Sequence, residues 1–117
     1  MPVFKDVQTV ATSGVVTNIM AGSKFEFLPR NSVIRIYASQ DGTTRNVDLD
    51  FTLGNVVVGD SLAPNRAAAA GVGPDRNTDL LATGVGAAGD RIQIRAQETT
   101  GVVGSQPIRV LVEINEL

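Results

Sequence analysis

The sequence contains no cysteine, no histidine and no tryptophan among its 117 residues. Without cysteine there is neither a disulfide framework nor a thiolate metal site. Without histidine the chain lacks the commonest general base, the commonest metal ligand and the side chain that titrates near neutral pH. The usual Ser-His-Asp triad is therefore excluded, although serine and threonine are plentiful.

Clustered charge and long apolar runs are also missing. The ten Lys and Arg residues are scattered, no two of them adjacent, and the formal net charge is −2. Because phosphate contacts supply most of the affinity for nucleic acid, we expect no nucleic-acid partner. No apolar run approaches the roughly 18 residues that a membrane-spanning helix needs. Residues 1–6 lack the features of a signal peptide, so we expect no membrane partner and synthesis in the cytoplasm without Sec-type export.

What the sequence does contain is alternation of apolar and polar residues. Residues 90–98 and 108–117 alternate almost without interruption, and a period of two is typical of strands with one buried face. We expect these two segments to pair as a closing hairpin. The side chains that this pattern directs to the core are Ile92, Ile94, Val110, Val112 and Ile114.

Two further alternating runs lie in the middle of the chain, at residues 33–39 and 46–53. Asp41-Gly42 between them is typical of a tight hairpin turn, so we expect these runs to pair with each other. The apolar positions of the two runs are Ile34, Ile36 and Ala38 in the first, and Val47, Leu49, Phe51 and Leu53 in the second. Both sets are expected to face the core.

Shorter runs complete the expected strands. Residues 7–20 predict two strands with a break at Gly14, and Lys24–Phe27 predicts a strand with Phe25 and Phe27 pointing inward. Gly54-Asn55 predicts a turn, after which residues 56–58 form a short apolar strand.

The segment 59–89 is rich in glycine and alanine and predicts a long loop region, with a short strand near residues 78–83. Loops of this length are usually functional or ordered by a partner. Altogether the chain predicts one all-β domain over residues 1–117, an antiparallel, jelly-roll-like β-sandwich of seven to nine short strands.

Three motifs have both a chemical and an ordinary interpretation. Residues 84–89 match the dinucleotide-binding pattern G-x-G-x-x-G, but they lead into an alternating strand rather than a helix, which favours a flexible loop. Residues 75–79 read D-x-N-x-D, yet an EF-hand is excluded by Leu80 and Gly86 at its sixth and twelfth positions. An ordinary Asx turn or a looser cation site remains there.

The third motif is Asp48 and Asp50, which lie about 7 Å apart on one face of an expected strand. Paired carboxylates can perform acid–base chemistry, but the alternation already explains both side chains as part of the solvent-exposed face of a strand. We therefore expect no catalytic residue, no cofactor and no resident metal, and do not expect an enzyme.

Some apolar side chains fall on the face opposite the core. Val33, Tyr37 and Leu111 either belong to central strands that are covered on both faces or meet another subunit. An Ala/Gly-rich loop with little core of its own is easier to explain if a neighbour orders it. The candidate partner or subunit contacts are Leu62, Ala67, Ala68, Ala69, Ala70, Val72, Tyr37 and Leu111.

With these features the chain resembles small virion proteins of tailed bacteriophages, in particular the decoration or cement proteins of the capsid exterior. The stretch KFEFLPRNSVIRIYA at 24–38 and the strand IRVLVEI at 108–114 carry the resemblance. It implies a jelly roll or related sandwich, often a homotrimer, bound to the major capsid protein on the capsid surface. The alternative is a carbohydrate- or receptor-binding module of a tail fibre or adhesin.

Overall fold

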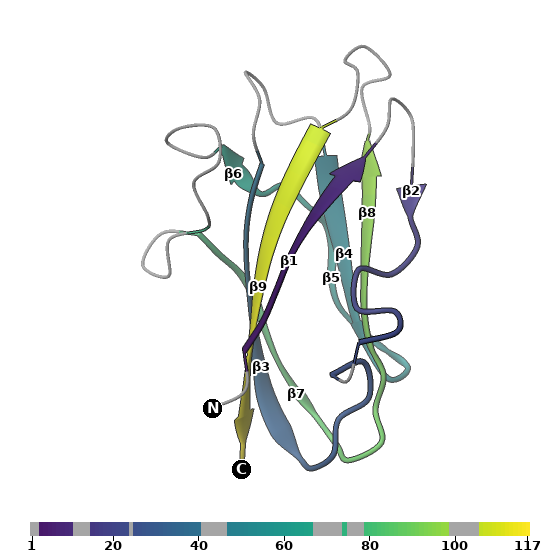
Figure 1. Ribbon diagram of the computed structural model, residues 1–117. Helices are drawn as coiled ribbons and strands as arrows, with labels where there is room; N and C mark the ends of the chain where they lie inside the picture. Colours follow the sequence, from purple (N-terminus) through teal and green to yellow (C-terminus); the bar gives the residue numbers. More distant parts are fainter. Residues whose placement is uncertain are drawn as a thin grey trace.

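The computed structural model describes residues 3–10, 15–23, 25–40, 47–66, 74, 79–98 and 106–117 (Figure 1). All the regular secondary structure in these ranges is β, which confirms the predicted class. The strands are β1 (Val3–Val10), β2 (Val15–Val16), β3 (Ser32–Gln40), β4 (Val47–Leu53), β5 (Val56–Leu62), β6 (Asn65–Arg66), β7 (Leu80–Gly86), β8 (Ile92–Glu98) and β9 (Gln106–Glu116).

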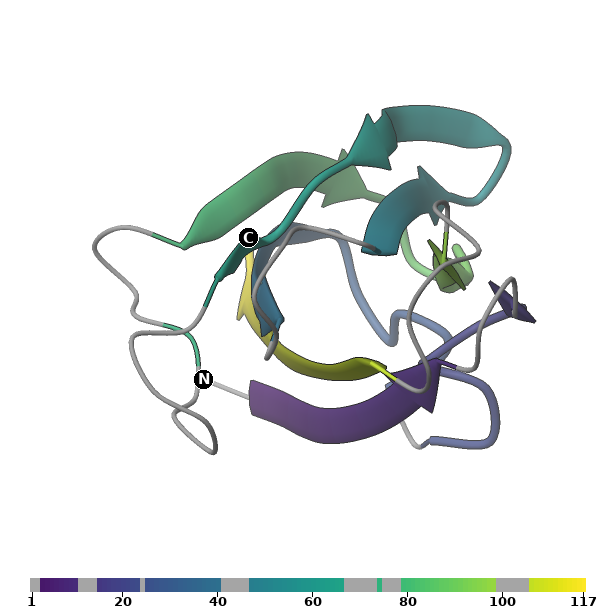
Figure 2. The same cartoon turned by 90° about the horizontal axis from the view of Figure 1, so that it is seen from above.

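The strands form two sheets that face each other around a common interior (Figure 2). Sheet A has the order β1-β9-β3-β6, with β7 also paired to β3, and sheet B has the order β2-β8-β4-β5. Among the strands that the structure describes, each pairing is antiparallel except the short one between β3 and β6.

The strand order is that of a jelly roll. The pairs β1–β9, β2–β8, β3–β7 and β4–β5 together make one long antiparallel hairpin. That hairpin folds over on itself, so that β9 also pairs with β3 and β8 also pairs with β4. The arrangement is the double-sheet jelly roll, and it confirms the predicted sandwich.

The core lies between the sheets and consists of the residues that alternation directs inward. In β3, β4, β8 and β9 these side chains are 2% exposed or less, and they are Ile34, Ile36, Ala38, Val47, Leu49, Phe51, Leu53, Ile92, Ile94, Val110, Val112 and Ile114. Phe25 packs against this core as predicted, whereas Phe27 is 57% exposed, contrary to the prediction. The predicted strand at 24–27 is also wrong, because the described residues 25–27 form a turn, a bend and a single bridge from Phe27 to Arg91, and Leu28 takes the buried position instead.

Both predicted long hairpins are wrong. The strands β8 and β9 lie in opposite sheets, and so do β3 and β4. Alternation reports which face of a strand is buried but not which strand lies beside it, and in a jelly roll the partners are distant in sequence. The predicted Asp41-Gly42 turn lies outside the described residues.

The segment 59–89 is also less loop-like than predicted, because β5 runs on to Leu62 and β7 occupies Leu80–Gly86. Three of its glycines, Gly59, Gly84 and Gly86, lie within strands at close approaches rather than in a loop. A Cβ atom at Gly84 would lie 2.9 Å from Leu53 Cδ1 and 3.2 Å from Val58 Cγ2, so only glycine lets β7 pack this closely against β4 and β5.

Candidate functional site

The outer faces of the two sheets differ in exposure. On sheet A, Tyr37 and Leu111 are only 6% and 7% exposed, and the Tyr37 hydroxyl donates to Glu113 Oε1 at 3.0 Å. On sheet B the outward residues of β4 and β8 alternate with the core residues and are half-buried or exposed. The centre of sheet B is therefore more open than the centre of sheet A, whose exposed apolar side chains Leu80 and Val85 lie on β7.

The predicted contact residues fall into three groups. Tyr37 and Leu111 lie opposite each other in register, on strands with neighbours on both sides. Both side chains are buried within the single chain, and their contact with another subunit stays a prediction. Leu62 is half-buried at the end of β5, while Ala67–Ala70 and Val72 lie outside the described residues.

A β-bulge shapes the open face at its edge. Leu49 pairs with Leu62 and Phe51 pairs with Gly59, so two residues of β5, Asp60 and Ser61, stand against one residue of β4. The bulge places Ser61 at φ +53°, in the left-handed region. As a result, the Ser61 N–H donates to Asp50 Oδ1 at 2.7 Å.

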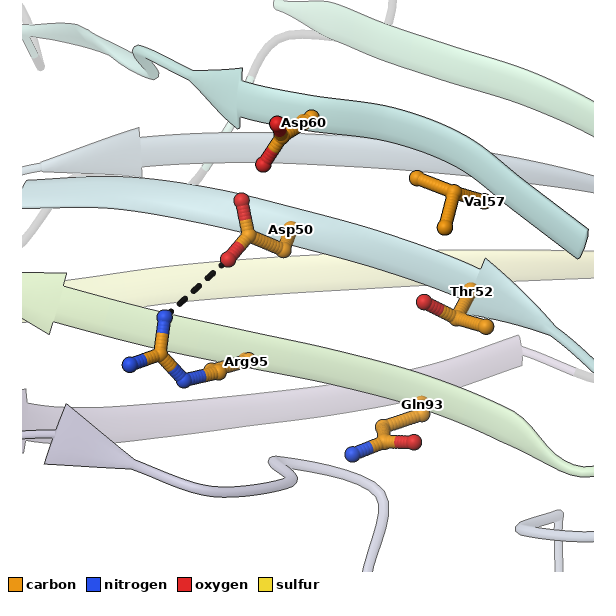
Figure 3. Close-up of a pocket in the computed structure, with 6 residues that line it drawn as sticks. All are labelled: Asp50, Thr52, Val57, Asp60, Gln93 and Arg95. Carbon is orange, nitrogen blue, oxygen red and sulfur yellow. Dashed lines mark hydrogen bonds and ion pairs between the residues drawn. The ribbon is translucent and has the colours of Figure 1, made fainter.

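A row of charged side chains crosses the sheet at this bulge (Figure 3). Arg95 on β8 contacts Asp50 on β4, with 3.1 Å between Nη1 and Oδ2, and also donates to Gln97 Oε1 at 3.0 Å. On the other side of Asp50, the carboxyl of Asp60 faces it from β5. The row thus holds two neighbouring carboxyl groups and one guanidinium.

Interactions within the row shift the pKa values of its carboxyl groups in opposite directions. The Ser61 N–H, then Asp60 and Arg95, lower the pKa of Asp50. The hydrogen bond to Asp50 and the charge of Asp50 raise the pKa of Asp60. Desolvation, followed by the charge of Asp50, also raises the pKa of Asp48. A proton entering this region therefore binds to Asp60 or Asp48 before Asp50.

The row forms part of a shallow hollow of about 280 Å³. Its lining residues are Asp50, Thr52, Val57, Asp60, Gln93 and Arg95 (Figure 3). Carboxylates, a hydroxyl, an amide and a guanidinium supply both donors and acceptors, while Val57, 64% exposed, supplies an apolar wall. The arrangement suits binding of a group that is polar on one side and apolar on the other.

One end of the open face carries an aromatic ring beside an ion pair. Phe27 bridges to Arg91, and Arg91 Nε lies 2.7 Å from Glu26 Oε2. A hydrogen bond from the Gly22 N–H, followed by Arg91, lowers the pKa of Glu26. This ion pair is balanced in charge, so the excess charge of the face lies in the row around Asp50.

Sequence reasoning placed Asp48 and Asp50 on a solvent-exposed face but missed Asp60, which fell within the predicted loop.

In the part of the chain that the structure describes, no three acidic side chains are grouped to hold a metal ion. Most of the 75–79 motif lies outside that part, although Asp79 Oδ1 accepts from Asn65 Nδ2 at 3.1 Å. Nor do the described residues include a helix long and apolar enough to cross a membrane.

The fold and the face together define the chain as a jelly-roll β-sandwich with one open, acidic sheet face. No family model matches the sequence, and no curated protein matches it either.

Proposed function

We propose that this protein is a structural component of a virus particle, a decoration or cement protein that binds the capsid exterior and stabilises the shell. The observation that carries the proposal is the open outer face of sheet B, with exposed Val57 beside the polar row and exposed Phe27 at the end of the face near Arg91. A flat face of this kind can be buried against a larger protein surface, with apolar anchors next to hydrogen-bonding groups. Jelly rolls recur in capsid proteins and in lectin domains, an analogy of fold rather than of site.

The size of the face favours binding by several copies. Seven residues in each of β4, β5 and β8, with two more in β2, give a projected area of about 370 Å². A standard stable interface buries about 800 Å² on each partner. One face alone would therefore bind weakly, and linking three copies in a homotrimer would raise the avidity through effective concentration.

Stabilisation of the shell would follow from mass action. A protein that binds the assembled shell, but not its separated subunits, shifts the equilibrium toward the shell. Particles that carry the protein should then release their genome at a higher temperature than particles that lack it.

The experiment is a composition and rebinding test on virus particles from a genome that encodes this chain. Mass spectrometry should find the chain in purified particles at a fixed ratio to the major capsid protein. Val57→Ser, which removes an exposed valine from the open face, should reduce rebinding to particles that lack the chain. Val85→Ser is the matched control, because Val85 is similarly exposed, at 67% against 64%, but lies on β7 of sheet A. Absence of the chain from particles would overturn the proposal.

The hollow favours a second candidate, a carbohydrate-binding module. Asp50, Asp60, Gln93 and Arg95 offer hydrogen bonds to sugar hydroxyls, and Val57 offers a surface for the apolar face of a ring. A glycan array tests this directly. A saturable hit that Arg95→Gln removes, together with absence of the chain from particles, would favour this function over the first.

A further inference from the structure

The open face carries an unbalanced negative charge. Its outward charged groups in the described part of β4, β5 and β8 are Asp48, Asp50 and Asp60 against Arg95, three carboxylates and one guanidinium. The neighbouring Arg91 and Glu26 pair with each other and cancel. The face therefore has an excess of two negative charges, equal to the net charge of −2 of the whole chain.

Within this face, the Asp60 carboxyl lies at the hollow, near the guanidinium of Arg95. Arg95 is engaged by Asp50 and Gln97, and Asp50 also accepts the Ser61 N–H. The Asp60 carboxyl faces the Asp50 carboxyl across the bulge and lines the hollow with Val57 (Figure 3). When both are ionised, the two carboxylates repel each other, and a positive group placed beside them would offset the repulsion.

We propose that the open face docks on a protein surface that inserts a lysine or arginine side chain into this hollow. The cationic end lies against Asp60 and Asp50, and the aliphatic stem lies along Val57. A long basic side chain fits this combination because its methylene groups bury on apolar surface while its head pairs with carboxylates. The identity of the partner as a capsid protein rests on the proposed function, but the basic side chain is inferred from the charges of the face.

The test uses the full chain, labelled with ¹⁵N and ¹³C, and the peptide acetyl-Val-Arg-Val-amide as the probe. In NMR titrations at low salt, the peptide should shift the Val57 methyl and Asp60 carboxyl signals in a saturable way. The same peptide with citrulline in place of arginine keeps the shape but loses the charge, and it should produce no saturable shift. Asp60→Asn should weaken binding of the arginine peptide by about two- to fivefold, as expected for an exposed ion pair.

The matched control is Glu116→Gln, which also removes one negative charge from an exposed residue but lies at the end of β9 in sheet A. It should bind the arginine peptide like the unchanged protein. Equal binding of the citrulline peptide, or equal weakening by Glu116→Gln and Asp60→Asn, would overturn the proposal. The citrulline comparison needs no variant, so it stands even where a substitution disturbs folding.

The outcome separates the two proposals. If particles contain the chain and Asp60→Asn rebinds to them as tightly as the unchanged protein, the basic-side-chain inference fails while the proposed function stands. If the peptide binds at Asp60 as described but particles lack the chain, the proposed function fails and the charge-specific docking site stands.

Discussion

Replacing Gln40 by methionine should remove a polar connection between the two sheets. The Gln40 side chain on β3 is completely buried and reaches across to the start of β4. Its Oε1 accepts the Val47 N–H at 3.1 Å, and its Nε2 donates to Val47 O at 3.3 Å and to Pro64 O at 2.8 Å. Methionine has a similar length and fills the space but makes none of these hydrogen bonds.

The expected cost follows from the groups that lose their partner. A buried donor or acceptor left unsatisfied costs about 1–3 kcal/mol, with the single N–H at the upper end and the carbonyl oxygens at the lower end. Burial of the more apolar methionine offsets part of this cost. We therefore expect Gln40→Met to lower the free energy of unfolding by about 3 kcal/mol, out of a total of about 5–15 kcal/mol for a domain.

A second substitution, Gln40→Glu, adds a pH signature. The introduced carboxylate keeps an acceptor for the Val47 N–H but places negative charge beside Val47 O and Pro64 O, so its pKa in the folded state rises above the unfolded value of about 4.3. A raised pKa in the folded state means that stability is retained below about pH 4 and lost as the pH rises through the folded pKa. Relative to the unchanged protein, Gln40→Glu should lose more stability at pH 7 than at pH 4, whereas the deficit of Gln40→Met should stay constant.

Urea denaturation followed by circular dichroism at both pH values measures these differences. A Gln40→Met variant within about 0.5 kcal/mol of the unchanged protein, the range of ordinary surface changes, would refute the reasoning that these hydrogen bonds stabilise the sandwich. A Gln40→Glu deficit that does not change with pH would refute the placement of the side chain against two carbonyl groups.

Three further substitutions test the edge of sheet B and its contact with β7. The raised pKa of Asp48 means that its ionised form costs stability as the pH rises, so Asp48→Asn should raise the free energy of unfolding in urea titrations at pH 7 by up to about 0.5 kcal/mol and have no effect near pH 3. Gly84→Val should lower the melting temperature, because its side chain meets Leu53 and overpacking costs about 1–3 kcal/mol; an unchanged melting temperature would contradict the close approach of β7. At the positive φ of Ser61, Ser61→Gly should be more stable than Ser61→Ala by about 1 kcal/mol in urea titrations, the reverse of the usual order in strands.

The faces of the strands could be predicted from the sequence, but their neighbours could not. Alternation placed Phe51 and Ile94 in the core, and it placed Leu111 on the far side of β9. That Leu111 is nevertheless buried, at 7% exposed, and that β9 lies between β1 and β3, no local pattern encodes. The Asp41-Gly42 signal favoured a local hairpin, whereas β3 and β4 belong to different sheets.

The candidate site was predictable only in part, for a related reason. The wet face that holds Asp50 follows from alternation in β4. The approach of Asp60 depends on one extra residue in β5 and on the left-handed backbone of Ser61, a conformation that serine adopts without marking it in the sequence. Gly59 and Gly84 also favoured a loop prediction for this region, since glycine usually indicates a loop, but here both lie within strands.

The place of β9 in sheet A has a consequence for how the chain folds. Val3 pairs with Glu113, so 109 residues of the chain lie between two neighbouring positions, and β9 also bridges β1 to β3. Pairings between such distant segments form slowly, because loop-closure entropy opposes them before any contact forms. During synthesis, the edge of β3 that will bind β9 stays open until β9 has left the ribosome. In that interval the open edge of β3 can pair wrongly with a strand of another copy. Sheet A reaches its native form only after β9 has been released.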